Sequence, residues 1–319
     1  MGVSLNMLRL ISRRCYSVHG APAKASASAV RQLTVKDIID KYHNGSPISM
    51  VTAYDYITAS WAQKANTDMI LVGDSVAMCS LGYESTTQLS LEEFKYHVAS
   101  VCRAPGNAFV VVDMPFGSFE KSIPSGIENA FQLLHLNPRV QAVKVECGLA
   151  KNDYSLDYMR ELIRRGIPVV GHIGLTPQRV HSLGGYKVQG NQQTADAIAL
   201  YNVSQRLQEM GCFALVLECI PHKITSVISK KLQIPTIGIG AGPGTSGQVL
   251  VQSDLLGMLK GHVPKFVKTY ANLQIDAVSA LNQYVKEVQN KSFPKVGEHT
   301  FRVSDEVYQD FVSKVDKDT

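Results

Sequence analysis

Short apolar stretches alternate with longer amphipathic ones along most of this chain. The apolar stretches are rich in β-branched residues, and segments with helical spacing, such as 155–166 and 195–211, follow them. Strands that alternate with helices predict a parallel sheet of the α/β class. The predicted strands lie within 48–55, 69–75, 109–115, 142–147, 167–172, 213–219 and 234–242.

The number of these units bears on the architecture. Seven clear strands and a weaker eighth near 254–259 favour a (β/α)8 barrel, the TIM barrel. A doubly wound sheet has the same periodicity, so the pattern alone leaves it open. The tail from residue 269 contains a further good helix, which we expect to pack outside the barrel. We therefore predict a single barrel domain with a C-terminal helical tail over 31–319, preceded by a separate segment over 1–30.

Charge is unevenly distributed along the 319 residues. The net charge is +5, but residues 1–36 carry six Lys or Arg and no acid, and the rest of the chain has 26 basic and 27 acidic residues. A nearly neutral body lacks the basic face that binds phosphates, so we expect no nucleic-acid partner. No stretch approaches the roughly 18 apolar residues of a membrane helix, so we expect no membrane association.

The basic excess belongs to the N-terminal segment. Residues 7–29, "MLRLISRRCYSVHGAPAKASASA", are rich in Arg, Ser and Ala, lack acids and space their apolar residues as an amphipathic helix does. This composition resembles a mitochondrial presequence and predicts a protein of the mitochondrial matrix. A disordered basic tail is the alternative.

Ionisable residues stand where the predicted strands end. Asp113, Glu146 and Glu218 end apolar runs, and Asp74 and His172 each follow one by a single glycine. The C-terminal ends of barrel strands converge on one face, so we expect these side chains to line one pocket. Either Asp taken alone could instead cap the next helix, but Glu is a poor cap.

The strand "AVKVEC" (142–147) carries two charges inside an apolar run. Side chains two positions apart on a strand point to the same side, so Lys144 and Glu146 should face the pocket together. Carboxylates that lie close together repel one another unless a cation is present. Oxygen ligands without a Cys or paired-His motif favour Mg²⁺, so we predict that Asp74, Asp113 and Glu146 bind it directly or through water. Lys144 would then bind an anionic substrate held by the metal.

Nine segments between about residues 33 and 298 form an ordered set of motifs. They are "MVTAYDY", "ILVGDSVAM", "DMPFGS", "VKVE", "GHIGLTPQ", "GGYKVQG", "LVLECIP", "IPTIGIGAG" and "GHVPKF". In this order they resemble the motifs of the 3-methyl-2-oxobutanoate hydroxymethyltransferase family, also called ketopantoate hydroxymethyltransferases. A match of this many ordered motifs is far more specific than any single one.

The resemblance implies a barrel of the phosphoenolpyruvate/pyruvate type and a step of pantothenate and coenzyme A biosynthesis. The implied reaction transfers a hydroxymethyl group from 5,10-methylenetetrahydrofolate to 3-methyl-2-oxobutanoate, giving 2-dehydropantoate and tetrahydrofolate. It also implies a homo-oligomer, commonly a decamer. Many relatives have Gly where this chain has Cys147, which affects the expected local turn.

The resemblance further implies roles for individual residues. The magnesium ligands match Asp74, Asp113 and Glu146, and the proton acceptor matches Glu218. The contacts to the 2-oxo acid match Asp74, Ser75, Asp113 and Lys144, with His172 lining the pocket.

The residue types also fit this chemistry. A 2-oxo acid can chelate Mg²⁺, which stabilises the enolate formed when the C3 proton leaves. Lys144 and His172 would neutralise or hydrogen-bond the substrate oxygens, Ser75 would donate to the carboxylate, and Glu218 would take the proton.

The six cysteines form no metal-binding or disulfide pattern. They show no CxxC pair, so we predict free thiols. Cys147 and Cys219 directly follow candidate acids, and strand alternation would turn them away from the pocket, so we expect neither to be a nucleophile.

Other functions remain open on the sequence. The glycine-rich stretch 238–247 could hold a phosphate, although a tight turn at the pocket rim is preferred, and 184–190 is either a closing loop or an ordinary surface loop. A Mg²⁺-dependent 2-oxo-acid lyase on a related barrel is the nearest alternative enzyme. A catalytically silent ligand-binding protein is the alternative of another class.

Overall fold

A closed barrel of parallel strands forms the body of the molecule. The computed structural model describes residues 31–259, 261 and 263–316. Each strand pairs with the next, and β1 pairs with β8 to close the barrel. Closure confirms the predicted (β/α)8 fold and excludes the open doubly wound sheet. The strands are β1 (Ile48–Thr52), β2 (Met69–Val72), β3 (Phe109–Asp113), β4 (Val140–Glu146), β5 (Val169–Gly174), β6 (Ala214–Glu218), β7 (Thr236–Ile239) and β8 (Gly247–Leu250).

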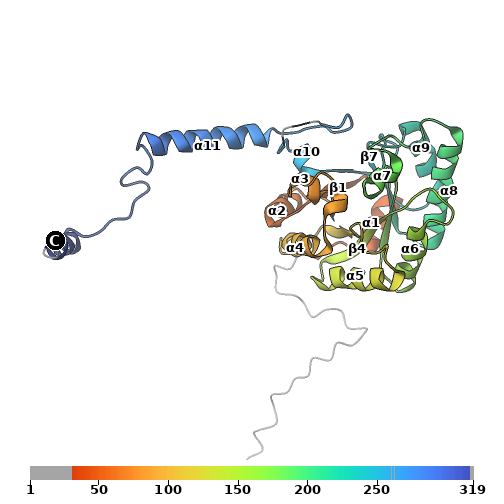
Figure 1. Cartoon of the computed structure of the whole chain (residues 1–319), viewed down its shortest axis with the longest axis horizontal. Helices are drawn as coiled ribbons and strands as arrows, with labels where there is room; N and C mark the ends of the chain where they lie inside the picture. The colour runs from red at the N-terminus through yellow and green to blue at the C-terminus, as the bar shows by residue number, and fades with distance from the viewer. Residues whose placement is uncertain (1–30, 260, 262, 317–319) are drawn as a thin grey trace, which may run out of the picture.

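Helices connect the strands and surround the barrel (Figure 1). Capping boxes, in which a Ser, Thr or Asp side chain and the residue three positions later bond each other's backbone N–H, begin α1, α2 and α4. The larger helices of the barrel are α1 (Val35–His43), α2 (Tyr56–Lys64), α4 (Leu91–Cys102), α5 (Ile123–His135), α6 (Tyr154–Arg164), α8 (Thr194–Met210) and α9 (His222–Lys231). The short ones are α3 (Val76–Cys79), η1 (Thr86–Gln88), η2 (Pro177–Arg179), α7 (Val180–Leu183) and α10 (Gln252–Leu255).

Alternation along each strand divides the core in two. In β3, Phe109 and Val111 belong to the cluster inside the barrel, whereas Val110 and Val112 pack in the outer cluster beneath the helices. The inside cluster begins near the N-terminal ends of the strands, where the rings of Phe109 and Phe213 meet edge to face at 5.6 Å between centroids. Apolar packing therefore fills the N-terminal end of the barrel and leaves the C-terminal strand ends to polar residues.

The prediction of the eighth strand was wrong in its position. Residues 254–259 lie in and after the short helix α10, and β8 is the four-residue segment from Gly247 to Leu250. A Cβ on Gly247 would lie 2.4 Å from the carbonyl oxygen of Ile48, so only glycine permits the close approach of β8 to β1. A strand this short with a glycine at its start has no apolar run to mark it.

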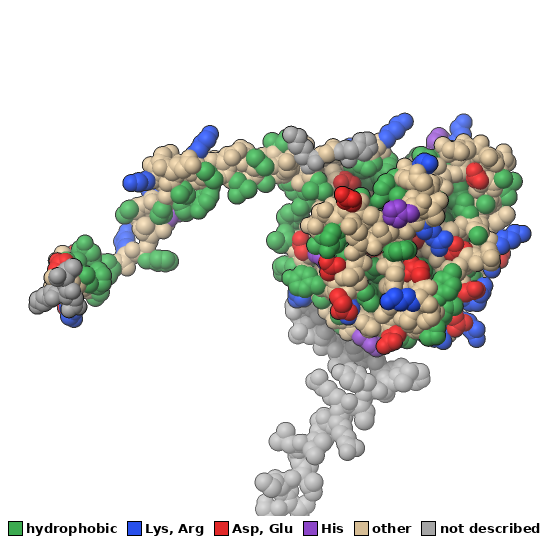
Figure 2. All heavy atoms as spheres, in the orientation of Figure 1, with side chains coloured by type: hydrophobic (Ala, Val, Ile, Leu, Met, Phe, Trp, Pro, Cys, Tyr) green, Lys and Arg blue, Asp and Glu red, His purple; other side chains and the backbone are tan. Residues whose placement is uncertain are grey.

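The C-terminal tail departs from the expectation in a different way. It does form helices, α11 (Leu273–Gln289) and α12 (Asp305–Val315), as the predicted tail required. Neither helix has a buried residue, and α11 extends away from the barrel (Figure 1). The prediction that it packs on the outside of its own barrel was therefore wrong, and hydrophobic side chains stay exposed along it (Figure 2).

Two other expectations concern segments rather than the barrel. The presequence-like segment 1–30 lies outside the described residues. Within the described part of the chain, none of the helices combines the length and the apolar composition that crossing a membrane requires.

Candidate active site

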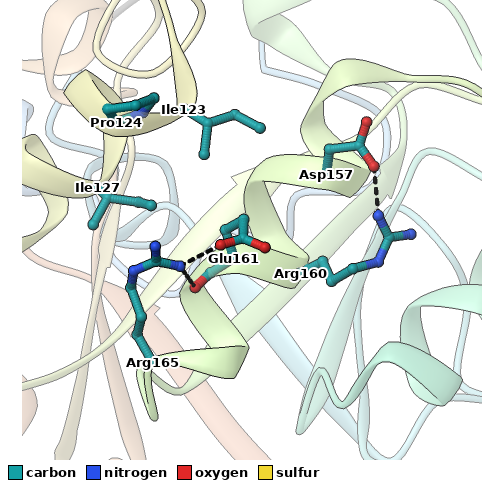
Figure 3. Close-up of a pocket in the computed structure, with 7 residues that line it drawn as sticks. All are labelled: Ile123, Pro124, Ile127, Asp157, Arg160, Glu161 and Arg165. Atoms are coloured by element: carbon teal, nitrogen blue, oxygen red, sulfur yellow. Dashed lines mark hydrogen bonds and ion pairs between the residues drawn. The ribbon is translucent and has the colours of Figure 1, made fainter.

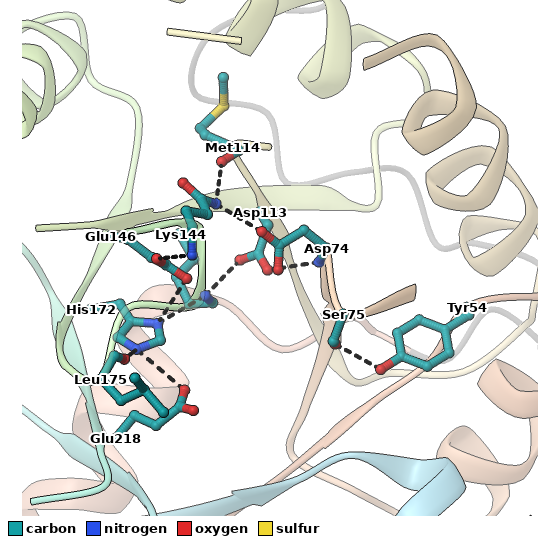
Figure 4. Close-up of polar contacts among 11 residues, drawn as sticks. Tyr54, Asp74, Ser75, Asp113, Met114, Lys144, Glu146, His172, Leu175 and Glu218 are labelled. Carbon is teal, nitrogen blue, oxygen red and sulfur yellow. Dashed lines mark hydrogen bonds and ion pairs between the residues drawn. The ribbon is translucent and has the colours of Figure 1, made fainter. Parts of the chain in front are cut away.

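All seven residues predicted from the sequence meet at one pocket at the C-terminal ends of the strands. They come from the ends of β2, β3, β4, β5 and β6 or from the residues that follow. Figure 4 shows the charged residues and His172 grouped together, with Ser75 beside them pointing toward Tyr54. The pocket encloses about 160 Å³. The predicted residues that line it are Asp74, Ser75, Asp113, Lys144, Glu146, His172 and Glu218.

Strand alternation explains how the charges reach this pocket. Lys144 and Glu146 both line it. Val143, which precedes Lys144, and Val145, which lies between the two charged residues, pack in the outer cluster. The same period places Asp113 above Val111 on the inner side of β3. The expectation that the two charges of β4 face one side is confirmed.

Lys144 is the centre of the polar network. Its ammonium lies 2.9 Å from Oδ1 of Asp113 and donates to Nδ1 of His172 at 3.0 Å. Burial lowers the pKa of Lys144, but three nearby carboxylates, Asp113 first, outweigh burial and raise the pKa above its usual value. The side chain is therefore a permanent buried cation that faces the cavity.

These contacts fix the tautomer of His172. Because the ammonium of Lys144 can only donate, Nδ1 of His172 accepts, and the ring proton of the neutral imidazole is on Nε2. Nε2 donates to the carbonyl oxygen of Leu175 at 2.8 Å and lies 3.3 Å from Oε2 of Glu218. The histidine thus links the lysine to the predicted base.

The two aspartates are held together rather than used as helix caps. The backbone N–H of Asp74 donates to Oδ2 of Asp113 at 2.9 Å, and the following helices have Ser75 and Ser122 at their N-caps. The capping alternative is therefore wrong for both. Burial, and then the charge of Asp113, raises the pKa of Asp74 to about 7. Burial and neighbouring carboxylates, Asp74 first, raise the pKa of Glu146 well above its usual range.

This arrangement is short of positive charge. A fifth carboxylate, Asp254, also lines the pocket, and Lys144 is its only Lys or Arg among the described residues. Asp254 was not predicted as a site residue, because the sequence pattern predicts a strand over 254–259 where the structure has the end of α10. Burial raises the pKa of Asp254 as well. The pocket therefore favours a further cation or protons on some of the acids.

The donor set is compatible with a hard divalent ion. Oxygen atoms of Asp74, Asp113 and Glu146 are available, and Oδ1 of Asp113 is buried and accepts no hydrogen bond despite its ion pair with Lys144. Among the described residues, however, no three His, Cys, Asp or Glu side chains are placed to ligate one ion together. Contacts through water, which Mg²⁺ commonly retains, would have to complete such a site.

The structure adds residues that the sequence analysis did not single out. The hydroxyl of buried Tyr54 pairs with Oγ of Ser75 at 2.8 Å. Tyr186, in the glycine-flanked loop 184–190, lines the pocket, and its hydroxyl lies 3.6 Å from Sδ of Met78. Both tyrosines stand in the quoted motifs "MVTAYDY" and "GGYKVQG", but only the fold shows which side they face.

The cysteines behave as expected. The five described ones form no disulfide. Burial raises the pKa of the Cys147 thiol and raises that of Cys219 to about 12, which suppresses the thiolate that a nucleophile requires.

A second hollow lies on the outside of the barrel between α5 and α6 (Figure 3). Its charged residues form ion pairs with one another. Arg160 pairs with Asp157 at 2.5 Å. Arg165 pairs with the carboxylate of Glu161 and also donates to the backbone carbonyl oxygen of Glu161 at 2.8 Å. None of the predicted site residues lines this hollow, so it gives no support for a second active site.

Comparison with known proteins identifies the family. A family model described as "Ketopantoate hydroxymethyltransferase" matches residues 32–296. The chain belongs to the ketopantoate hydroxymethyltransferase family. It is 50% identical over 318 residues to the 3-methyl-2-oxobutanoate hydroxymethyltransferase of Saccharomyces cerevisiae, covering 99% of this chain and 100% of that one. This family membership makes the protein a transferase.

Other relatives carry the same name across distant organisms. The relative from Emericella nidulans is 41% identical, and the match covers 95% of this chain and 85% of that one. The relative from Nitratidesulfovibrio vulgaris is 44% identical, and the match covers 94% of this chain and 96% of that one. Among solved structures, a phosphoenolpyruvate phosphomutase from Streptomyces platensis has a TM-score of 0.53 at 12% identity, covering 90% of this chain and 98% of that one. A 2,3-dimethylmalate lyase of the PEP mutase/isocitrate lyase superfamily has 0.52 at 13%, covering 90% and 99%. These structures confirm the fold.

We predict that the metal-free protein loses stability as the pH rises. The pKa of Asp74 is about 7 in the folded protein and about 3.9 in an unfolded chain. Stability from its protonated form is therefore complete below about pH 4 and is lost as the pH rises through about 7. In EDTA, the melting temperature should fall between about pH 4 and pH 7 and level off above that range. Asp74→Asn should flatten this fall, whereas parallel curves for the two proteins would contradict the assignment.

Proposed function

We propose that this enzyme transfers a hydroxymethyl group from 5,10-methylenetetrahydrofolate to 3-methyl-2-oxobutanoate, giving 2-dehydropantoate and tetrahydrofolate. The observation that carries the proposal is the convergence of the seven predicted residues on one pocket of a chain in this family. The product would serve pantothenate and coenzyme A biosynthesis.

The pocket offers separate groups for the two ends of a branched 2-oxo acid. Lys144 supplies a buried positive charge for the carboxylate and keto oxygens, and the hydroxyl of Ser75 can donate to the carboxylate. Apolar side chains that line the same cavity are suited to the isopropyl group; they are Leu71, Val216, Ile239 and Val249.

Magnesium is the proposed cofactor of this site. Asp74 and Asp113 would hold it together with Glu146, in part through water, which agrees with the surplus of buried carboxylates. When bound, Mg²⁺ would polarise the oxygens of the 2-oxo acid and make its C3 proton easier to remove.

Glu218 is the proposed base. Glu218 ends β6 and is half-buried, with its Oε2 3.3 Å from Nε2 of His172. Its side chain keeps 15% exposure and lines the pocket, so it can reach a substrate in the cavity. Glu218 would take the C3 proton, and C3 would form a bond to the folate methylene carbon as a carbon–nitrogen bond breaks. Water would then displace the second nitrogen and supply the hydroxyl group.

A coupled assay with the purified protein tests this function. Product should form from 3-methyl-2-oxobutanoate only when methylenetetrahydrofolate and Mg²⁺ are both present. Folate-independent cleavage of a 2-hydroxy diacid would instead favour the lyase. Binding of the 2-oxo acid without turnover in the complete mixture would favour a silent binding protein.

We predict that Glu218→Gln slows exchange of the C3 proton of 3-methyl-2-oxobutanoate with deuterium by about 10²-fold or more, because the amide cannot accept the proton. Binding of the 2-oxo acid with Mg²⁺ should be retained. Glu209→Gln, at an exposed position of α8, is the matched control and should exchange as the wild type does. NMR of the C3 position measures the rate, and unchanged exchange in Glu218→Gln would exclude Glu218 as the base.

Import into the mitochondrial matrix is proposed for the same enzyme. The Arg-rich, acid-free composition of residues 1–30 supports it. A fluorescent fusion of the full chain should enter mitochondria, and deletion of residues 1–30 should leave it in the cytosol. A truncated fusion that still enters mitochondria would refute targeting by this segment.

Assembly into a homo-oligomer is also proposed. Apolar residues recur at every third or fourth position of α11, on one face that its own barrel does not cover; they are Ile275, Val278, Leu281, Val285 and Val288. A second copy of the chain is the occupant we propose for this face.

We predict that Leu281→Glu, by placing a charge in that face, shifts the protein to smaller species in analytical ultracentrifugation. Gln283→Glu adds a charge of the same sign outside the apolar face and should leave the assembly unchanged. A wild-type protein that sediments as a monomer would contradict the proposal.

A further inference from the structure

One buried residue, Gln178, contacts the ends of three different barrel strands. It lies in η2, after β5, and its side chain is almost fully buried. Its backbone N–H donates to Oε2 of Glu146 at 3.0 Å. Its side-chain nitrogen donates to Oδ2 of Asp74 at 2.8 Å and to the carbonyl oxygen of Met114 at 2.9 Å. Gln178 therefore bridges two of the acids proposed to hold the metal.

The chemistry of these partners determines the orientation of the carboxamide. A carboxylate and a backbone carbonyl can only accept hydrogen bonds, so the nitrogen of Gln178, not its oxygen, must face both. Both of its hydrogens are then used, one on Asp74 and one on the main chain next to Asp113. The carboxylate of Asp74 is thereby held at a set position relative to β3.

The segment that carries Gln178 is itself anchored. The neighbouring Arg179 forms a two-pronged ion pair with Asp153, at 2.5 and 2.9 Å, and donates to Oγ of Ser155 at 2.8 Å. Asp153 in turn caps the start of α6. A Cβ on Gly148 would lie within 2.6 Å of both members of the ion pair. Because glycine has no Cβ, the chain leaves just enough room for the ion pair at this point. Gln178 is thus presented to the acids from a rigid support.

We propose that Gln178 is a positioning residue, which sets the separation of the Asp74 and Glu146 carboxylates for a bound divalent ion. This inference rests on the proposed function only in that these acids hold the ion. Pro177, not Gln178, lines the cavity, so Gln178 acts through the acids rather than on the substrate. If the side-chain amide of Gln178 were removed, the carboxylate of Asp74 would lose a hydrogen-bond donor. Asp74 would then turn away from the nearby charge of Asp113.

Mn²⁺ binding by the purified full-length protein tests this role, with electron paramagnetic resonance as the readout and no substrate present. Gln178→Met keeps the length of the side chain and the backbone N–H but removes both side-chain donors. We expect it to weaken Mn²⁺ affinity about tenfold or more, as loss of a residue that orients metal ligands commonly does.

The matched control is Gln252→Met. Gln252 is buried to the same degree, and its side-chain nitrogen donates to the carbonyl oxygen of Thr58 rather than to an acid. This variant should bind Mn²⁺ as the wild type does, even if its melting temperature falls. If Gln178→Met does not fold, Gln178→Asn, shorter by one methylene, replaces it and is expected to show the same loss.

Three results would overturn the proposal: wild-type affinity in the Gln178 variant, an equal loss in Gln252→Met, or a wild-type protein that binds no Mn²⁺. Failure of the proposed function is read separately, from the absence of 2-dehydropantoate in the coupled assay of the wild type.

Discussion

The ion pair between Lys144 and Asp113 is the contact around which the pocket is organised. Both side chains are almost completely buried, and their charges lie 2.9 Å apart. Taking either charge out of water without the other would be strongly unfavourable, because a buried charge needs a partner close by. The other polar groups of the site, from His172 to Asp74, are arranged around this pair.

The pair compensates only part of the negative charge in the pocket. The negative charge that Lys144 does not compensate raises the pKa values of Asp74 and Glu146, since burial and mutual repulsion favour the protonated forms of both acids. A structure built only for stability would avoid such a cluster. Its presence at the end of a barrel is typical of a site that binds a cation or moves a proton.

The barrel resolves the conflict between this charge and an apolar core by keeping the two at opposite ends. Residues of the inside cluster, such as Phe109 and Val111, fill the N-terminal half, and Asp113 on the same face of β3 is the first polar position above them. Because the period of a strand is two, the outward-facing valines can pack beneath the helices without regard to the pocket chemistry. Substitutions in the outer core therefore affect stability more directly than they affect the site.

The sequence by itself determined the α/β class and favoured the barrel, and it placed charged residues at the strand ends, because strand alternation and the position of an ionisable residue at a strand end are local properties. Closure of the barrel required the tertiary structure, and Ser75 was identified only through the resemblance to the family. The sequence did not locate β8, since a four-residue strand that starts at Gly247 depends on contact with β1 rather than on its own apolar pattern. It also did not reveal Asp254 or the bridge from Gln178 to Asp74, two residues 104 positions apart in the chain. Only the closed barrel brings such distant residues together, and only the tertiary structure shows that α11 leaves its apolar face outside its own barrel.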